Sequence, residues 1–166
     1  MSTRANIVLK ESYSYKAKNG KRVVKNQELI FYKHSDGYPE GVMPILNKFM
    51  EWIKEGKIRD NVSQAGGWLI LLGAMEYNTM PNFETEKAHF EGGKAYGNID
   101  TIEAPKDWKC GAYEPTTGIH GDIEFLYEVD LTNKEIIVKQ EQILTYEPLK
   151  TAWVEVNVSN LAKIPR

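Results

Sequence analysis

The residue types best suited to chemistry lie in the stretch KHSDGYPEG, residues 33–41. A strand-like run ends there and a helix-like run begins, so unpaired backbone N–H groups and the positive end of a helix dipole would face a bound group. Lys33, and His34 when protonated, would add positive charge. Asp36 and Glu40 are also ordinary caps for the same N–H groups. The stretch therefore indicates either an anion site or a capped turn.

A second group of polar residues lies in GAYEPTTGIHGDIE, residues 111–124, ahead of another strand-like run. It contains Thr117, His120 and Asp122. If the sheet places this stretch beside the end of the N-terminal strands, the His and Asp residues of both stretches share one rim. Two His and two carboxylates suit a divalent metal or acid–base chemistry. However, no metal motif of fixed spacing is present, so we expect no metal ligands and no cofactor.

Other catalytic signatures are absent from the sequence. No Gly-x-Ser-x-Gly elbow occurs, and no glycine-rich phosphate loop follows a strand. Cys110, the single cysteine, excludes an internal disulfide and has no catalytic signature beside it. We therefore expect no catalytic residues and favour a non-enzymatic protein, while leaving the question of an enzyme open.

Aromatic residues beside the polar stretches suggest a ligand that can stack. A turn requires neither Tyr38 nor Glu40, and rings such as Tyr38 and Trp108 can stack on nucleotide bases. In this hypothesis cationic side chains and backbone N–H groups neutralise phosphate, and carboxylates bind hydroxyls or base edges. The candidate ligand-binding residues are Arg4, Lys33, His34, Asp36, Tyr38, Glu40, Trp108, Thr117, His120 and Asp122.

Three motifs together resemble a group of small proteins carried by phages and prophages. They are TRANI, YKHSDGYPEGV and YEPTTGIHGDIEFLYEVD, spread over most of the chain. The resemblance implies an accessory factor that acts on the host cell. By analogy, small phage proteins of other families are sponges, often oligomeric, that sequester cyclic or modified nucleotide immune signals. The expected function is thus sequestration of a nucleotide-like ligand by a homodimer that counters host defence.

Two other functions stay open. One is a metal-assisted or acid–base hydrolase acting on a phosphate-containing substrate. It would use His34, Asp36, Glu40, His120 and Asp122. The other is an inhibitor of a host protein, which would bind its partner through the long irregular segment 79–121.

Composition limits the class of protein. Apolar residues make up 42% and charged residues 27%, as in a globular domain. The net charge of −2 argues against binding of long nucleic acid, because there is no whole-molecule positive field. The N-terminal residues lack the apolar run of a signal peptide, and no run is long enough to span a bilayer. We expect a cytoplasmic protein, in the host cytoplasm if phage-encoded.

The elements expected to position these residues form a single α+β domain, 1–166. The N-terminal strands flank Asn19 and Gly20, which predict a type I′ hairpin, with a kink or bulge at residues 25–27. Apolar spacing predicts a first helix from Met43 to Gly56 and a second from an N-cap at Ser63 to residue 78. Three further strands follow the irregular segment. The prediction is an antiparallel sheet packed against two helices, with the second helix between the sheet and the first.

Overall fold

The order of elements is that of an α+β protein, as predicted. The computed structural model describes residues 2–77 and 110–158. Most of the predicted irregular segment, with Trp108, lies outside the described residues. The elements are β1 (Ala5–Lys16), β2 (Arg22–Lys33), α1 (Pro39–Lys54), α2 (Val62–Tyr77), β3 (Glu114–Thr116), β4 (Phe125–Asp130), β5 (Glu135–Tyr146) and β6 (Leu149–Glu155). Neither helix is long and apolar enough to cross a membrane.

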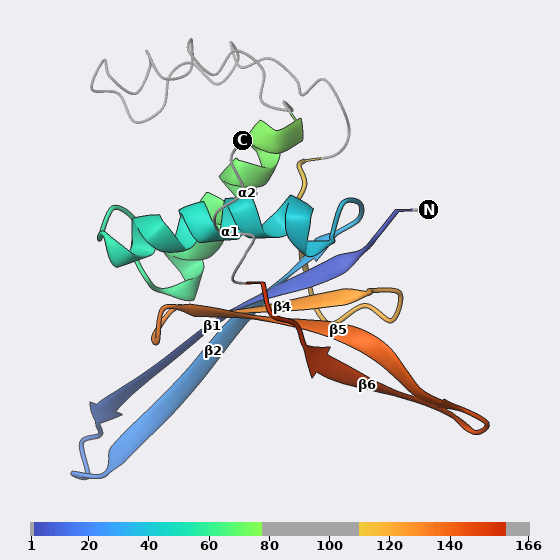
Figure 1. The fold of residues 1–166 in the computed structure, drawn as a ribbon. Coiled ribbons are helices and arrows are strands. Elements are labelled where there is room, and N and C mark those ends of the chain that lie inside the picture. The colour runs from blue at the N-terminus through green and yellow to red at the C-terminus, as the bar shows by residue number, and fades with distance from the viewer. Residues whose placement is uncertain (1, 78–109, 159–166) are drawn as a thin grey trace.

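The strands form one sheet in the order β3-β2-β1-β4-β5-β6. Every neighbouring pair is antiparallel except β1 and β4, which run parallel in the centre of the sheet. A parallel pair needs a long crossover connection, and α1 and α2 lie within it. Both helices cover the same face of the sheet (Figure 1). The opposite face is called the outer face below.

Alternation along the strands builds the core between the sheet and the helices. Alternate residues of β1 and β4 are buried on the helix side: Ala5, Ile7, Leu9, Phe125, Tyr127 and Val129. The alternation in EFLYEVD predicts one apolar and one acidic face for this strand, and the alternating burial of β4 confirms it. The prediction that α2 lies between the sheet and α1 is wrong. Because α2 packs on β1 and β2 while α1 packs on β5, each helix contacts the sheet directly.

Helix α1 begins earlier than the sequence pattern predicts. It starts at Pro39, so the predicted start near Met43 is wrong. Pro39 takes the first helical position, where a missing N–H removes no intrahelical bond, whereas Pro44 is accommodated inside the helix. Gly56 ends the helix as predicted, with φ of 72°.

Helix α2 is capped by Asn61 rather than by Ser63. The Asn61 side-chain oxygen accepts a hydrogen bond of 3.2 Å from the Gln64 N–H, and its carbonyl accepts one from Ala65. Both are the bonds of an N-cap residue. The prediction of a Ser63 cap is therefore wrong. A start at Val62 instead buries both Val62 and Ala65 in the core.

The hairpin between β1 and β2 exists, but two predicted details of it are wrong. Type I′ geometry needs positive φ at both central residues, and here only Gly20 has it, at 82°. The turn is closed by hydrogen bonds from Gly20 to Ala17 and from Ala17 to Lys21. The register from Ala5 to Lys16 is unbroken, so there is no bulge at residues 25–27.

Two glycines of α2 offer a matched test of packing. A Cβ on Gly73 would lie 2.8 Å from the Tyr113 backbone nitrogen, whereas a Cβ on Gly67 would meet nothing within 4 Å. Gly73→Ala should lower the free energy of unfolding by about 1–3 kcal/mol, because the backbone must move. Gly67→Ala should raise it by up to about 1 kcal/mol through helix propensity. Urea unfolding followed by circular dichroism measures both, and equal effects would contradict this packing.

Candidate functional site

The structure brings residues of the two predicted stretches together on the outer face. We call Arg4, Tyr32, His34, His120 and Asp122 the Tyr32 cluster. Because side chains alternate along β2, Tyr32 and His34 point away from the helices, whereas Phe31 and Lys33 point toward them. Four of the ten predicted ligand-binding residues are in this cluster.

The Tyr32 ring is the centre of the cluster. Its centroid lies 3.9 Å from that of His120, in a stacked arrangement, and 5.8 Å from that of His34. The Tyr32 hydroxyl donates a hydrogen bond of 3.0 Å to Asp122. The same carboxylate oxygen pairs with Nη1 of Arg4 at 3.2 Å. One aromatic ring thus links two imidazoles, a guanidinium and a carboxylate.

Asn6, which the sequence analysis missed, positions the His120 loop. Its buried side chain donates to the Phe31 carbonyl at 2.9 Å and accepts the His120 N–H at 2.8 Å. On the ring side, the Thr116 hydroxyl lies 2.9 Å from Nε2 of His120. The predicted Thr117 is exposed beside it. The signal for Asn6 was available, because a polar residue inside the apolar run ANIVL must find partners when buried.

The electrostatics of the cluster keep Tyr32 a hydrogen-bond donor. Burial and the hydrogen bond to Asp122 raise the pKa of Tyr32, so its hydroxyl stays protonated at neutral pH. Arg4 and Asp122 are 39% and 46% exposed, so their ion pair contributes at most about 1 kcal/mol. Nε of Arg4 is buried and has no hydrogen-bond acceptor. The donors of this guanidinium are therefore not all used within the described part of the chain.

Lys33 lies on the opposite face from the Tyr32 cluster. Its side chain is 1% exposed, and its ammonium is 3.3 Å from a carboxylate oxygen of Glu76. The rings of Tyr77 and Tyr113 lie 5.8 and 5.4 Å from the ammonium. Burial raises the pKa of Tyr113, whose hydroxyl has no hydrogen-bond partner among the described residues. The sheet thus separates Lys33 from Arg4, the other cation predicted to bind phosphate.

The remaining predicted residues surround the start of α1. Asp36 is exposed and has φ of 55°, and no cap bond from its side chain forms, because Tyr38 takes the N-cap position without a side-chain bond. Tyr38 is 39% exposed, and Glu40 is exposed in the first turn. The interpretation of Asp36 as the helix cap is therefore wrong. None of these three residues belongs to the Tyr32 cluster.

Gly37 sets the path of this turn. Its N–H donates to the Thr3 carbonyl at 2.9 Å, and its own carbonyl accepts a hydrogen bond of 2.6 Å from the buried Tyr127 hydroxyl. A Cβ at this position would lie 2.8 Å from that of Ala5. Gly37 therefore lets the turn approach β1, and that approach holds the start of α1 against the sheet.

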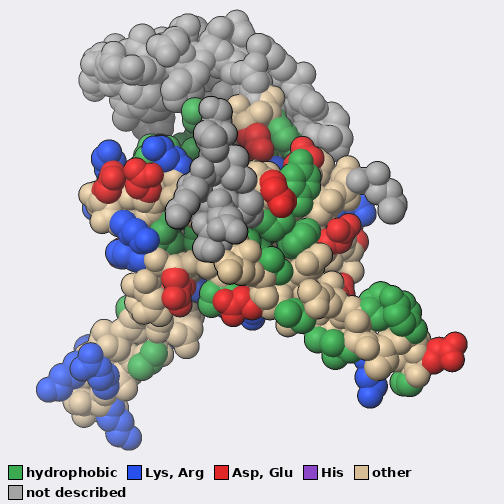
Figure 2. All heavy atoms as spheres, viewed as in Figure 1, with side chains coloured by type: hydrophobic (Ala, Val, Ile, Leu, Met, Phe, Trp, Pro, Cys, Tyr) green, Lys and Arg blue, Asp and Glu red, His purple; other side chains and the backbone are tan. Residues whose placement is uncertain are grey.

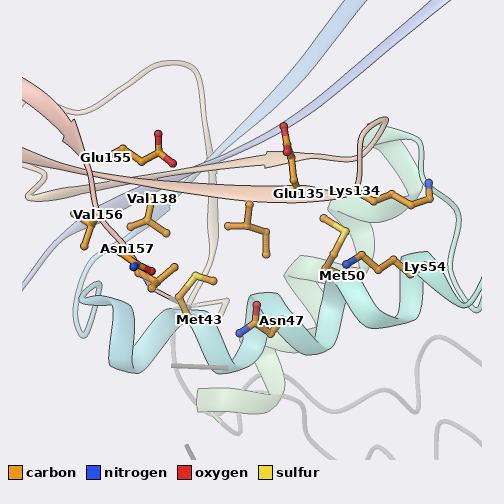
Figure 3. Close-up of a pocket in the computed structure, with 12 residues that line it drawn as sticks. Met43, Asn47, Met50, Lys54, Lys134, Glu135, Val138, Glu155, Val156 and Asn157 are labelled. Carbon is orange, nitrogen blue, oxygen red and sulfur yellow. The ribbon is translucent and has the colours of Figure 1, made fainter. Parts of the chain in front are cut away.

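A separate cleft of about 620 Å³ lies between α1 and the strands β5 and β6, and the sequence analysis missed it. Met43, Asn47 and Met50 line it from the helix, and Val138 and Asn157 line it from the sheet side (Figure 3). The amide nitrogen of Asn47 is buried and has no hydrogen-bond partner among the described residues. None of the predicted residues lines this cleft. In the part of the chain that the structure describes, no three His, Cys, Asp or Glu residues are grouped to hold a metal ion.

The contribution of the buried Lys33–Glu76 ion pair to stability can be tested. Glu76→Gln removes the countercharge of an ammonium that cannot reach water, so it should lower the free energy of unfolding by at least about 1.5 kcal/mol. Glu51→Gln, at an exposed pair with a 3.7 Å separation, should change it by less than about 0.5 kcal/mol. Urea unfolding at neutral pH compares the two variants. Equal losses would show that Lys33 is not held by Glu76.

Comparisons of the chain with protein-family models, with curated proteins and with solved structures give no match.

Proposed function

We propose that the chain is a binding protein, without turnover, for a small phosphate-bearing ligand. The supporting observation is the arrangement of Arg4, His34 and His120 around Tyr32 on one open face. Guanidinium groups bind phosphate through paired N–H donors, and imidazoles add further donors. The exposed His34 ring offers a surface on which a base can stack, whereas Tyr32 is buried and already stacked against His120.

Binding rather than catalysis is favoured because two of the three titratable candidates for acid–base work, Asp122 and His120, are already engaged. Asp122 accepts from both Arg4 and Tyr32, and the His120 ring contacts Thr116. A general base needs a free lone pair within reach of the substrate proton, and these contacts occupy the nearest candidates. Preformed donors held this way favour tight binding, because less freedom is lost when the ligand arrives.

The class of ligand to test first comes by analogy with small phage proteins of other families that sequester nucleotide immune signals. A cyclic or modified nucleotide immune signal combines phosphate, hydroxyls and bases, which match the cations, the carboxylate and the rings of the cluster. We propose its sequestration as the role of the protein in countering host defence. We further propose a homodimer, in which a second protomer would cover the open face.

A retention experiment separates the candidate functions. The protein is incubated with a panel of linear and cyclic nucleotides, washed and heat-denatured, and the supernatant is analysed by liquid chromatography with mass spectrometry. Release of an intact nucleotide supports the proposal. Release of a new product would favour the hydrolase instead, and no retention would leave an inhibitor of a host protein.

Arg4→Gln tests the site directly. It removes one guanidinium and should weaken binding of the retained nucleotide by at least about tenfold, since a charge-assisted hydrogen bond contributes roughly 1.5–3 kcal/mol. The matched control is Arg59→Gln, which removes an exposed arginine outside the cluster. Isothermal titration calorimetry measures both, and circular dichroism checks that each variant is folded. Unchanged affinity in a folded Arg4→Gln variant would place the ligand elsewhere.

A further inference from the structure

The hairpin of β1 and β2 extends far beyond the rest of the sheet. Strand β4 pairs with β1 only from Ala5 to Lys10, and β3 pairs with β2 only from Ile30 to Tyr32. The paired strands beyond these points therefore form a two-stranded arm, which projects away from the helices (Figure 1). We call residues 12–26 the basic arm. Counted from Lys10, six residues of β1 carry its tip about 20 Å beyond the pairing with β4, and Glu11 and Glu28 lie at its base.

The charge of the basic arm differs from that of the whole chain. It carries five cationic side chains and no carboxylate, and all five are exposed: Lys16, Lys18, Lys21, Arg22 and Lys25. Figure 2 shows Lys and Arg side chains gathered at its tip. Because the chain has a net charge of −2, the rest of the protein carries a surplus of seven carboxylates. The positive charge is therefore concentrated on a projecting element and separated from an acidic body.

Cations occupy both faces of the arm. Lys25 lies opposite Tyr13 on one face, and Lys16 lies opposite Arg22 on the other. Lys18 and Lys21 belong to the turn at the tip. A two-stranded ribbon with cations on both faces is suited to a binding site that has phosphates on both of its sides.

Side-chain contacts on both faces favour the extended form of the arm. Tyr13 and Tyr15 lie on one face with ring centroids 6.5 Å apart, and each is 45% exposed. On the other face Arg22 donates two hydrogen bonds to the Ser14 hydroxyl. At the base, Ser12 exchanges hydrogen bonds with the Thr132 hydroxyl in the turn after β4. These contacts support a hairpin that would be marginal on its own.

A second two-stranded arm in the same chain provides a contrast. Strands β5 and β6 also continue beyond β4, whose pairing with β5 ends at Gln140. Residues 141–152 of that arm carry two Glu and one Lys, and apolar side chains are exposed near its end (Figure 2). A projecting two-stranded arm therefore does not need positive charge to form. The positive charge is a specific property of the basic arm.

From this placement we infer that the basic arm binds nucleic acid by entering the major groove of a DNA duplex. That groove is about 12 Å wide and 8.5 Å deep and admits a two-stranded β-ribbon. Phosphates line both of its edges, so the cations on both faces and at the tip each have a partner. The length of the arm keeps the acidic body away from the duplex. The site is separate from the Tyr32 cluster, so this inference does not rest on the proposed function.

The experiment measures binding of a fluorescently labelled 20-base-pair DNA duplex by fluorescence anisotropy between 50 and 200 mM salt. Five phosphate contacts predict a slope of log affinity against log salt of about −4.5. The triple variant Lys18→Gln, Lys21→Gln and Lys25→Gln should reduce that slope by about 2.7 and weaken binding at least about tenfold at 50 mM salt. All three side chains are exposed, so circular dichroism should be unchanged.

The matched control removes the same charge elsewhere. Lys48→Gln, Lys54→Gln and Lys57→Gln change three exposed lysines in and after α1. This variant should bind the duplex about as tightly as the unaltered protein. No duplex binding at 50 mM salt, or equal losses in the two triple variants, would overturn the inference. Tighter binding of a single strand of the same length would also overturn it, since that would indicate stacking on the tyrosines rather than entry into a groove.

Discussion

The parallel pairing of β1 with β4 is the contact on which both faces of the sheet depend. It joins the N-terminal strand to a strand more than a hundred residues later, with both helices in the connection between them. On the helix side it lines up the buried residues of the two strands into one core. On the outer side the Glu124 N–H donates to the Arg4 carbonyl, which brings the loop of His120 and Asp122 beside Tyr32. Without this pairing the predicted rim would not form.

Local pattern was sufficient to predict every element of the fold except β3, which lies in the segment expected to be irregular. Long-range pairing explains most of what was missed, because β3 forms only by pairing with β2. The alternation in β4 and the apolar stripe of α1 were readable because each residue's burial follows from its neighbours in the chain. The parallel direction of β1 and β4 could not be predicted from the sequence. It depends on a crossover connection whose residues carry no signal of strand direction. The N-cap of α2 is a smaller example of a detail that local pattern could not decide. Asn61 and Ser63 are both good caps, and packing against the sheet selects between them.

The candidate site was also predictable only in part. Lys33 and His34 are adjacent in the sequence, so both could be assigned to one loop, but strand alternation sends them to opposite faces of the sheet. Alternation alone does not tell which of the two faces is covered by helices. In IFYKH, apolar and polar residues do not alternate clearly enough to show it. Glu76 decides the outcome, because a carboxylate on α2 lets an ammonium be buried there with its countercharge.

The net charge of the chain is a poor guide to what its surfaces attract. An average of −2 does argue against a uniform positive field, and it is the reason that long nucleic acid was not expected. However, charges in salt act over about 8–10 Å, and the basic arm extends about 20 Å from the sheet. A phosphate at the arm's tip is therefore attracted by five cations and only weakly repelled by the carboxylates of the body. The fold changes the electrostatic conclusion because it places the cations together on the arm, away from the carboxylates that balance their charge. The expectation from composition therefore applies to the body of the protein, and the inference from structure applies to the arm.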